Sequence, residues 1–573
     1  MLSKLFRRKT DFQLTEEGSH SLHKVLSVRD LTLFGIAAII GAGIFTSVGK
    51  ACASGGPAVI WLFIICAVAC AFAALCYAEF ASRIPVSGSA YTYAYATFGE
   101  LFAWVIGWAL LMEYAIGNIY VAFSWSGYFT HLLDGFGLYL PRWMVVDYSS
   151  AHKFILAKQG LIDAAMAQGN SGALWIAANC NDAEKELVVA WTTAPNLIGG
   201  LKLILDVPAL VINILITVLV YRGIKESRNA SNAMVILKIL AVVMVIAVGA
   251  FYIDFENFKP FMPKGFKGVM ASVSAVFFTY IGFDAISTLA EESQNPKRDL
   301  PRGMFYSLII CTVLYVLVSL VLTGMVPFIN LGVDDPLAYA LQVKNVKWLE
   351  YIVSIIAVVA MASVLLVFQL GQPRIWLSMS RDGLLPSAFS KIHPKNKTPS
   401  FSTIITGLAV GVPIIFTNED FVLDFTSIGT LFAFVLVCGG VLLLPKRELN
   451  GDDGFVLPHV HGKFLFPLLV ALSATIIYFS VPSYFDDVFD LSKSETFTSF
   501  NLPHIIFWLF LICLSVLTFL KNFNLIPLMG LATCGYLLTG MNPNNWYWFF
   551  VWFAIGLVIY FVYGYRNSVL NKK

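Results

Sequence analysis

Three ionisable residues lie inside long apolar segments of this sequence: Glu113, Lys238 and Asp284. A charged group within a segment that crosses a bilayer is costly, so such a residue marks a functional site by default. Glu113 lies about twelve residues from the start of its segment, which is near mid-membrane at about 1.5 Å per residue. We expect Glu113 either to serve the function directly or to be the structural partner of a buried lysine or a helix end.

Lys238 is flanked by aliphatic residues on both sides, in the stretch 235–240. Burial penalises the charged form of a lysine, so its side chain is suited to take up and release a proton. The alternatives are a static buried cation and a partner for Glu113. Ser363, in a later apolar segment, would meet the Lys238 ammonium if the two segments converge with the first one.

The first apolar segment is interrupted by Gly41, Ala42 and Gly43. Each glycine weakens a helix by about 1 kcal/mol relative to alanine, and unwound backbone in hydrocarbon is tolerated only where it is buried in protein or lines a cavity. A break here would offer the N–H groups of Ala42 and Gly43 to a carboxylate and the carbonyl of Ile39 to an ammonium. That arrangement suits an amino acid. The alternative is that small residues only let another helix pack closely.

The sixth apolar segment carries a second interruption, with Gly282 and Asp284 near its middle. We expect Asp284 to cap the second half of this helix; a proton-binding role is the alternative. The two interrupted segments occupy corresponding positions in two five-helix units of opposite orientation. This pattern indicates an inverted repeat with a binding site at the bilayer midplane.

The composition requires a membrane. Of 573 residues, 58% are hydrophobic and only 13% are charged, and the mean hydropathy is +0.76, which excludes a soluble globular domain. A spanning helix needs about 20 apolar residues, and about fourteen segments qualify, although the short ninth and the interrupted thirteenth also allow twelve or thirteen. The predicted segments are 30–50, 57–82, 100–132, 200–222, 230–253, 267–290, 303–327, 348–378, 401–416, 424–445, 464–482, 502–520, 523–540 and 546–565.

The distribution of basic residues predicts the orientation. With the N-terminus inside, about 25 Lys and Arg residues fall in cytoplasmic segments and about 12 outside, so both termini are expected in the cytoplasm. The predicted regions are a tail (1–29), a first five-helix repeat (30–253) with an outer loop at 134–199, a second repeat (254–445), and accessory helices with a short tail (446–573). The net charge of +3 reflects this topology and does not indicate nucleic acid.

The cysteines do not form a disulfide framework. Seven of the nine lie in predicted spans, and only Cys52 and Cys180 lie on the outer side, where a single bridge between them stays open. No outward-facing Asn-X-Ser/Thr sequon appears in this topology, which agrees with a bacterial membrane. We therefore expect a multi-pass protein of the cell (inner) membrane.

Several motifs together resemble one known group of proteins. They are Gly-Ala-Gly-Ile-Phe at 41–45, Glu-Tyr-Ala at 113–115, Lys238, the stretch 280–292, and Met-Ser-Arg-Asp-Gly-Leu-Leu-Pro at 379–386. In this order, over about residues 27–445, the chain resembles the amino acid–polyamine–organocation superfamily. It is most similar to bacterial relatives of the cationic amino acid transporters.

The resemblance implies an all-α, leucine-transporter-like five-plus-five fold with discontinuous helices 1 and 6. It implies main-chain recognition of an amino acid at Ile39, Gly41, Ala42 and Gly43, and at Phe278, Tyr280 and Ile281. Lys238, with Ser363, would replace a sodium ion and make transport proton-coupled, and Glu113 matches the acidic residue of span 3. The chain departs from the common pattern in its long 134–199 loop and in Ala42, where many relatives have Thr or Ser.

These observations predict a proton-coupled importer of L-amino acids. An exchanger or facilitator without proton coupling is the alternative, and a transporter-derived sensor or channel is a further one. No His-rich metal motif, nucleophile–base pair or phosphate loop points to an enzyme, so we expect no metal and no cofactor apart from the proton. The expected partners are the substrate and the lipid bilayer, with no nucleic acid, and the protein would be a monomer or homodimer. Whether the substrate is cationic or neutral is open.

Overall fold

The computed structural model describes residues 7–8, 26–84, 89–167, 180, 182–196, 202–222, 228–394, 398–444, 455–480, 484–489 and 501–572. Within these ranges every regular element is a helix, and no strand occurs. Most of the predicted tail 1–29 and the basic loop 223–227 lie outside the described residues.

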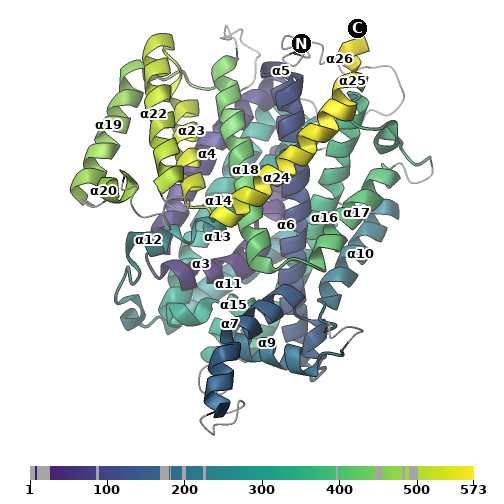
Figure 1. Ribbon diagram of the computed structural model, residues 1–573, viewed down its shortest axis with the longest axis vertical. Coiled ribbons are helices and arrows are strands. Elements are labelled where there is room, and N and C mark those ends of the chain that lie inside the picture. Colours follow the sequence, from purple (N-terminus) through teal and green to yellow (C-terminus); the bar gives the residue numbers. More distant parts are fainter. Residues whose placement is uncertain are drawn as a thin grey trace.

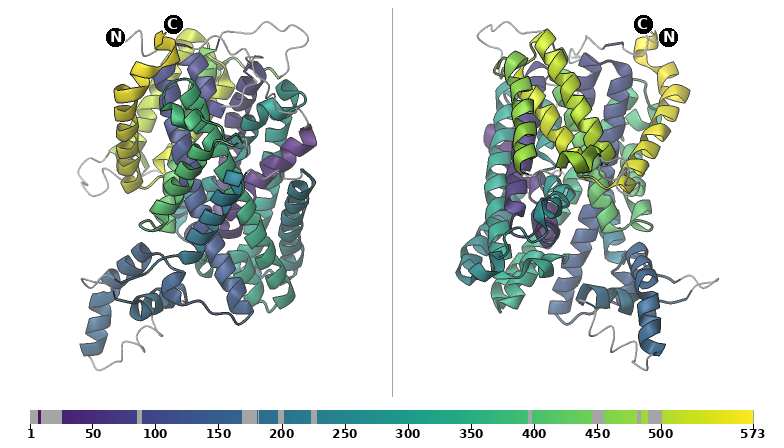
Figure 2. Two further views of the ribbon diagram at one scale, coloured as in Figure 1. Left: turned by 90° about the vertical axis from the view of Figure 1, so that its right-hand side faces the viewer. Right: turned by 60° about the vertical axis from the view of Figure 1, so that its left-hand side comes forward.

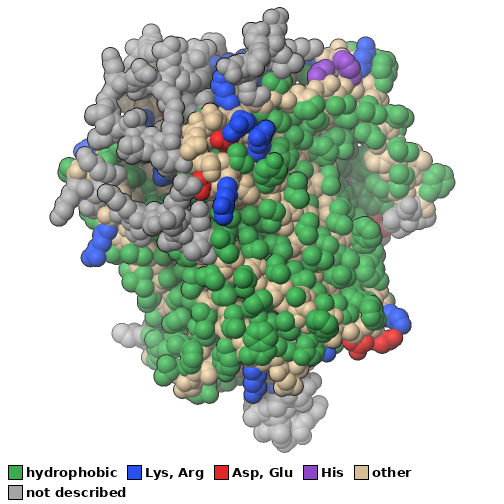
Figure 3. Space-filling view, turned by 180° about the vertical axis from the view of Figure 1, so that it is seen from behind, with side chains coloured by type: hydrophobic (Ala, Val, Ile, Leu, Met, Phe, Trp, Pro, Cys, Tyr) green, Lys and Arg blue, Asp and Glu red, His purple; other side chains and the backbone are tan. Residues whose placement is uncertain are grey.

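The apolar helices match the predicted spans one to one. Ten described helices are long and apolar enough to cross a membrane, one bent pair adds another span, and three shorter apolar helices complete the set. Beyond the bent pair they are α4 (Val59–Arg83), α6 (Glu100–Gly135), α10 (Val207–Arg222), α11 (Arg228–Gly249), α13 (Val273–Phe278) with η6 (Phe283–Glu292), α14 (Pro296–Met325), α16 (Lys347–Arg381), α17 (Ser400–Ile414), α18 (Glu419–Leu443), α19 (Gly462–Ser480), α22 (Leu502–Lys521), α23 (Leu525–Thr539) and α24 (Pro543–Ile559). Figure 3 shows hydrophobic side chains over the middle of one face, with charged side chains toward its ends.

The first span is broken where the sequence predicts it. Helix α2 (Val28–Ile39) begins with a capping box, in which Ser27 and Asp30 satisfy each other's backbone N–H groups. It ends at Ile39, and the chain resumes as a π-helix, η1 (Gly43–Ser47), followed by α3 (Val48–Gly55). The two halves are bent by 44° relative to each other.

The sixth span is broken as well, but its second half is not capped by Asp284. The 3₁₀ helix η6 begins after Gly282, whose φ of 117° places it in the left-handed region that glycine adopts without strain. Gly282 therefore holds the N-cap position, and Asp284 lies in the first turn. The capping prediction for Asp284 is wrong because the chain turns through a glycine.

Helix α6 is the centre of the bundle and packs against both α16 and α18, while α14 packs against α2 and α4 (Figure 1). Helices α19, α22 and α23 gather on one side of this bundle (Figure 2). Their outer faces carry exposed apolar side chains such as Phe464 and Leu520, as expected for surfaces that face lipid.

The two ends of the bundle differ. Both termini lie at one end, which we call the termini end, and helices α7 (Tyr148–Ala167) and α9 (Asp182–Thr193) cover the other, which we call the cap end (Figure 1). Arg142 ties the cap to the bundle: its Nη2 lies 2.7 Å from Asp134 Oδ2 and 3.5 Å from Glu186 Oε1. Cys52 and Cys180 are both free thiols, so the possible bridge between them is absent.

At the termini end, the last residues of the chain close over the start of α6. The fully buried carboxylate of Glu100 accepts hydrogen bonds from Tyr95 (3.2 Å), Tyr560 (3.0 Å) and Ser568 (2.5 Å). Nearby, Arg7 Nη1 donates to the carbonyl of Leu570 at 2.7 Å. We call this group the terminal clasp.

Candidate functional site

Lys238 points from α11 at the broken end of α2. Its side chain is 1% exposed, and its Nζ donates to the carbonyls of Ala37 (3.4 Å) and Ile40 (3.3 Å). The last carbonyls of a helix have no partner within the helix, and the negative end of the helix dipole favours a cation there. The break in helix 1 therefore provides the acceptors for the ammonium.

Ser363 of α16 supplies the third partner. Lys238 Nζ donates to its Oγ at 2.6 Å, and the same hydroxyl donates to the carbonyl of Ala360 at 2.9 Å. The first, fifth and eighth spans thus converge on one ammonium group, which is the condition for the expected contact between Lys238 and Ser363.

The main-chain groups at the break are only partly used. The carbonyl of Ile39 accepts a hydrogen bond from Tyr315 Oη at 3.0 Å, so one of its two lone pairs is engaged. The second half of the helix starts with the N–H groups of Ile44 and Phe45, each 3.2 Å from the carbonyl of Gly41. The N–H groups of Ala42 and Gly43 precede these first bonds, where a helix offers its donors to an anion.

The two breaks touch each other. A Cβ built on Gly43 would lie 2.9 Å from Thr279 Cα, and one on Gly282 would lie 3.0 Å from the carbonyl carbon of Ala38. Glycine alone permits backbones to approach so closely. The broken ends of both helices therefore meet at one place in the bundle.

A small cavity lies at this meeting point. It encloses about 10 Å³ and is lined by Ala38, Ile39, Gly41, Ala42, Gly43, Val121, Phe278, Ile281, Val364 and Phe368. We call it the midplane pocket. Val364 closes it from α16, because a Cβ on Gly41 would lie 2.6 Å from Val364 Cγ2. About 10–15 Å³ is needed to hold one water molecule, so the pocket is closed in this conformation.

The midplane pocket includes six of the seven predicted substrate residues. Tyr280 is the exception: its side chain points toward α4, where its Oη donates to the carbonyl of Phe63 at 2.9 Å. Four further lining residues were not predicted from the sequence: Ala38, Val121, Val364 and Phe368. These are ordinary apolar residues of membrane helices, and no local signal distinguishes them from lipid-facing or core positions.

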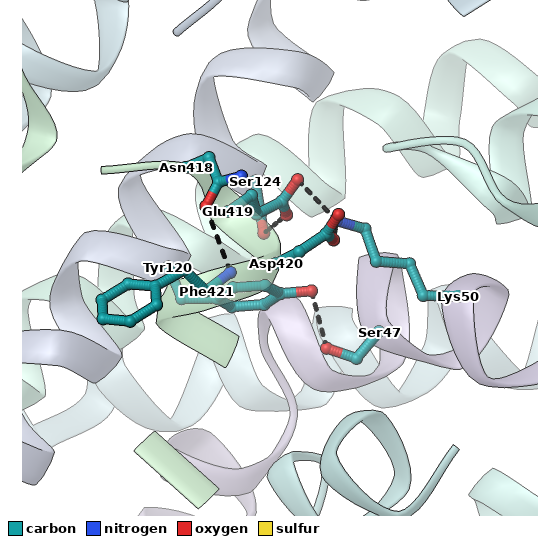
Figure 4. A network of polar contacts seen from close by, with 8 residues as sticks. All are labelled: Ser47, Lys50, Tyr120, Ser124, Asn418, Glu419, Asp420 and Phe421. Atoms are coloured by element: carbon teal, nitrogen blue, oxygen red, sulfur yellow. Dashed lines mark hydrogen bonds and ion pairs between the residues drawn. The ribbon is translucent and has the colours of Figure 1, made fainter. Parts of the chain in front are cut away.

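An aromatic pair stands between the pocket and the cap end. The ring of Phe278 meets that of Tyr120 edge-on, with centroids 4.5 Å apart. Tyr120 Oη accepts a hydrogen bond from Ser47 Oγ at 2.8 Å (Figure 4). This bond ties the pair to the second half of helix 1.

Lys50, one turn further along helix 1, forms ion pairs with the start of α18. Its Nζ lies 2.8 Å from Glu419 Oε2 and 3.0 Å from Asp420 Oδ1. Ser124 of α6 donates to Glu419 Oε1 at 3.2 Å, so three helices join in one network (Figure 4).

Between this network and the cap lies a second, larger space. It measures about 520 Å³, and we call it the vestibule. Lys50 is the only basic residue among its lining residues, and seven are acidic: Asp147, Glu186, Asp206, Asp334, Glu419, Asp420 and Asp424.

Several vestibule carboxyls outside the spans hold protons more tightly than usual. Burial raises the pKa of Asp206 to about 7, although hydrogen bonds from Ser126 and from the N–H of Ala209 oppose the shift. Burial also raises the pKa of Asp334, against the attraction of Lys50. The vestibule is thus a space whose walls carry many acidic groups, and burial makes several of them harder to ionise.

Glu113 and Asp284 lie on the other side of the pocket. Both are buried, at 4% and 1% exposure, and each is the charged neighbour of the other. Glu113 is eight residues before the pocket-lining Val121 on α6, or about 12 Å toward the termini end at about 1.5 Å per residue. The carboxylate pair therefore does not line the midplane pocket.

A multi-pass helical bundle with two broken spans, and a midplane pocket formed by their ends, defines a membrane transporter of the discontinuous-helix class. The sequence matches the family described as "Amino acid permease" over residues 26–511, and "C-terminus of AA_permease" over residues 525–568. The chain belongs to the amino acid permease family, and with it to the amino acid–polyamine–organocation superfamily of leucine-transporter-like fold.

Individual relatives carry different names. The chain is 38% identical to the branched-chain amino acid permease BcaP and 35% identical to the methylthioribose transporter, both from Bacillus subtilis (strain 168) and both over the full length of each chain. It is 33% identical to the vacuolar cationic amino acid transporter 4 of Arabidopsis thaliana, over 77% of this chain and 67% of the relative. The relatives are transporters and not enzymes, and they support amino acid transport in general.

Proposed function

We propose that the protein imports L-amino acids across the cell (inner) membrane by proton-coupled alternating access, with Lys238 carrying the proton. The cap end would face outward and the termini end the cytoplasm, since this orientation puts about twice as many basic residues inside as outside. The substrate carboxylate would bind the N–H groups of Ala42 and Gly43. Its ammonium would bind the carbonyl of Ile39 and those of the second break.

The contact set of Lys238 carries the proposal. A protonated lysine has three donors and no acceptor, and three acceptors surround its Nζ: the carbonyls of Ala37 and Ile40 and the hydroxyl of Ser363. Loss of the proton removes the charge and one donor. The hold on the end of α2 then weakens, and the first helix is released from α11 and α16.

The cycle follows from this difference. A proton from outside would charge Lys238 and stabilise the arrangement in which helix 1 is held. Release of that proton to the cytoplasm would free helix 1 and let the substrate leave. A shift of one pKa unit between the two arrangements corresponds to about 1.4 kcal/mol, which is enough to bias an equilibrium between two states about tenfold.

Proteoliposomes test this proposal directly. An inward pH gradient is expected to drive accumulation of amino acid by the native protein, whereas Lys238→Met keeps exchange between labelled and unlabelled substrate but no longer responds to the gradient. Ser363→Ala should weaken the response, and Ser354→Ala is the matched control, because its buried hydroxyl on the same helix makes no hydrogen bond with the described residues. Unaltered coupling in Lys238→Met would refute the role of this lysine.

The main alternative is an exchanger or facilitator in which Lys238 stays charged and only braces the site. It predicts exchange that ignores the pH gradient in the native protein. A sensor or channel predicts that no accumulation occurs at all.

A further inference from the structure

The walls of the midplane pocket carry information about the substrate side chain. Outside the polar main chain at the break of helix 1, the lining consists of Ala38, Val121, Phe278, Ile281, Val364 and Phe368. None of these side chains carries a charge or a hydrogen-bonding group. A charged or strongly polar group brought here would lose its hydration without gaining a partner, which disfavours its binding.

The charged group that contacts the broken end of helix 1 is the ammonium of Lys238, and it has the wrong sign to attract a cationic side chain. The ammonium of Lys238 bonds to the carbonyl of Ile40, which lies between the pocket-lining residues Ile39 and Gly41. Like charges in a poorly solvated site repel strongly. A lysine or arginine side chain would therefore bring a second cation toward Lys238, in addition to the α-ammonium that every amino acid carries.

Glu113, the carboxylate that would attract a cationic side chain, does not line the pocket. The ring of Phe368 packs against Gly117, midway between Glu113 and Val121 on α6, with its Cε2 3.1 Å from the Cβ position of that glycine. The same ring meets that of Tyr114 at a centroid distance of 5.5 Å. Phe368, which lines the pocket, thus packs on α6 between the level of Val121 and the level of Glu113.

We infer that the midplane pocket selects L-amino acids with uncharged aliphatic side chains, and that Val121, Val364 and Phe368 determine the size that is accepted. This inference rests on the proposed function of the site. The names of the relatives do not make the choice, because they include a branched-chain amino acid permease, a methylthioribose transporter and cationic amino acid transporters. The apolar walls and the position of Lys238 favour aliphatic over cationic side chains.

Val364 has the largest influence on size. Its Cγ2 occupies the space next to Gly41, so a substrate enters only when α16 and helix 1 separate at this contact. Removing the two methyl groups with Val364→Ala enlarges the pocket beside the break. In a hydrophobic pocket one methylene group changes discrimination by about 10- to 200-fold, so this variant should favour larger apolar side chains.

The test is counterflow in proteoliposomes without a pH gradient, which does not depend on proton coupling. Vesicles loaded with unlabelled leucine take up labelled leucine, and other amino acids compete from outside. We expect valine and isoleucine to compete fully, and lysine, arginine and glutamate to compete at least tenfold less. Val364→Ala should shift the preference for phenylalanine over valine by about tenfold or more. Val359→Ala is the control, an exposed valine on the same helix.

The outcomes separate the two proposals. Competition by lysine or arginine equal to that by valine overturns the aliphatic specificity but leaves amino acid transport intact. An unchanged phenylalanine-to-valine preference in Val364→Ala overturns the role of this residue. Absence of counterflow with all twenty amino acids overturns the proposed function itself. Thermal shifts of each purified variant with leucine, valine and phenylalanine give a second readout, because a bound ligand raises apparent stability.

Discussion

The vestibule and the midplane pocket are two separate spaces in the structure, and their walls consist of opposite kinds of side chain. The vestibule measures about 520 Å³ and has seven acidic residues in its walls, whereas the pocket measures about 10 Å³ and has apolar side chains. The Phe278–Tyr120 pair stands between them.

This difference indicates that the vestibule affects how a substrate approaches, whereas the midplane pocket selects which substrate binds. Carboxylates near the end of the bundle cost less than the same groups at mid-depth, because hydrogen-bond donors and Lys50 reach several of them. The charged walls set the local field for whatever approaches. A substrate must lose its hydration to enter the pocket. Its shape and its hydrogen bonds to the main chain then determine whether it binds. Changes in the pocket should therefore have large effects, and changes in the vestibule small ones.

The largest effect is expected for Gly41→Ala. The new Cβ would lie 2.6 Å from Cγ2 of Val364, a stiff β-branched side chain. Overfilling this packed contact costs the closed arrangement about 1–3 kcal/mol. Because each transport cycle must return through that arrangement, the uptake rate should fall by about 5- to 150-fold. Initial rates of uptake in proteoliposomes measure it.

Two further variants sharpen this prediction. The double variant Gly41→Ala/Val364→Ala removes the clashing methyl group and should recover most of the lost rate. Gly439→Ala is the matched control, because a Cβ there meets no atom closer than 3.8 Å. If Gly41→Ala transports like Gly439→Ala, the contact between helix 1 and α16 does not limit substrate entry.

An intermediate effect is expected for Asp206→Asn. It concerns the stability of the protein and not its transport rate. Burial raises the folded-state pKa of Asp206 from 3.8 to about 7, so the folded protein holds a proton that the unfolded chain releases near pH 4. Stability from this proton is full below about pH 4 and is lost as pH rises through about 7. The melting temperature of the native protein should therefore fall over this range, relative to the variant, by about 2–4 °C.

Asparagine can still accept the hydrogen bonds from Ser126 and Ala209 that Asp206 receives. Scanning fluorimetry of both proteins between pH 4 and 8 makes the comparison, with Glu256→Gln as an exposed control. Parallel pH profiles for the native protein and Asp206→Asn would show that Asp206 ionises normally in the folded state.

The smallest effect is expected for Glu186→Gln in the cap. Its side chain lines the vestibule but is 49% exposed, and it lies 3.5 Å from Arg142. Exposed charges are weakened by solvent and salt, so the KM for leucine should change by less than about twofold, and the order of competing amino acids should not change. A reordered preference would place side-chain selection in the vestibule and dissolve the distinction between the two spaces.

The sequence reveals the features that are rare in membrane helices. Glycines at 41, 43 and 282 and a lysine at 238 stand out against an apolar background, because each is costly there without a reason. The two breaks follow from them, whereas the contact between Lys238 and Ser363 is expected only on the condition that their two segments converge with the first one. The positions of the described apolar helices follow from hydropathy alone.

The rest depends on which residues meet across helices. Val121, Val364 and Phe368 look like any other apolar residue until α6 and α16 are placed beside helix 1. The bond from Tyr315 to the carbonyl of Ile39 has no local signal for the same reason. The cap of the second half of helix 6 was misjudged because aspartate is a common cap, and only the backbone angle of Gly282 identifies the true one.

The terminal clasp has a consequence for biosynthesis. Two of the hydroxyl donors of Glu100, Tyr560 and Ser568, lie 460 and 468 residues further along the chain and are therefore synthesised much later. At about 5–20 residues per second, the ribosome needs on the order of a minute to deliver them. Until then this carboxylate lacks two of its three donors, so a chain cut short before its last residues leaves Glu100 without the hydrogen bonds that compensate its burial.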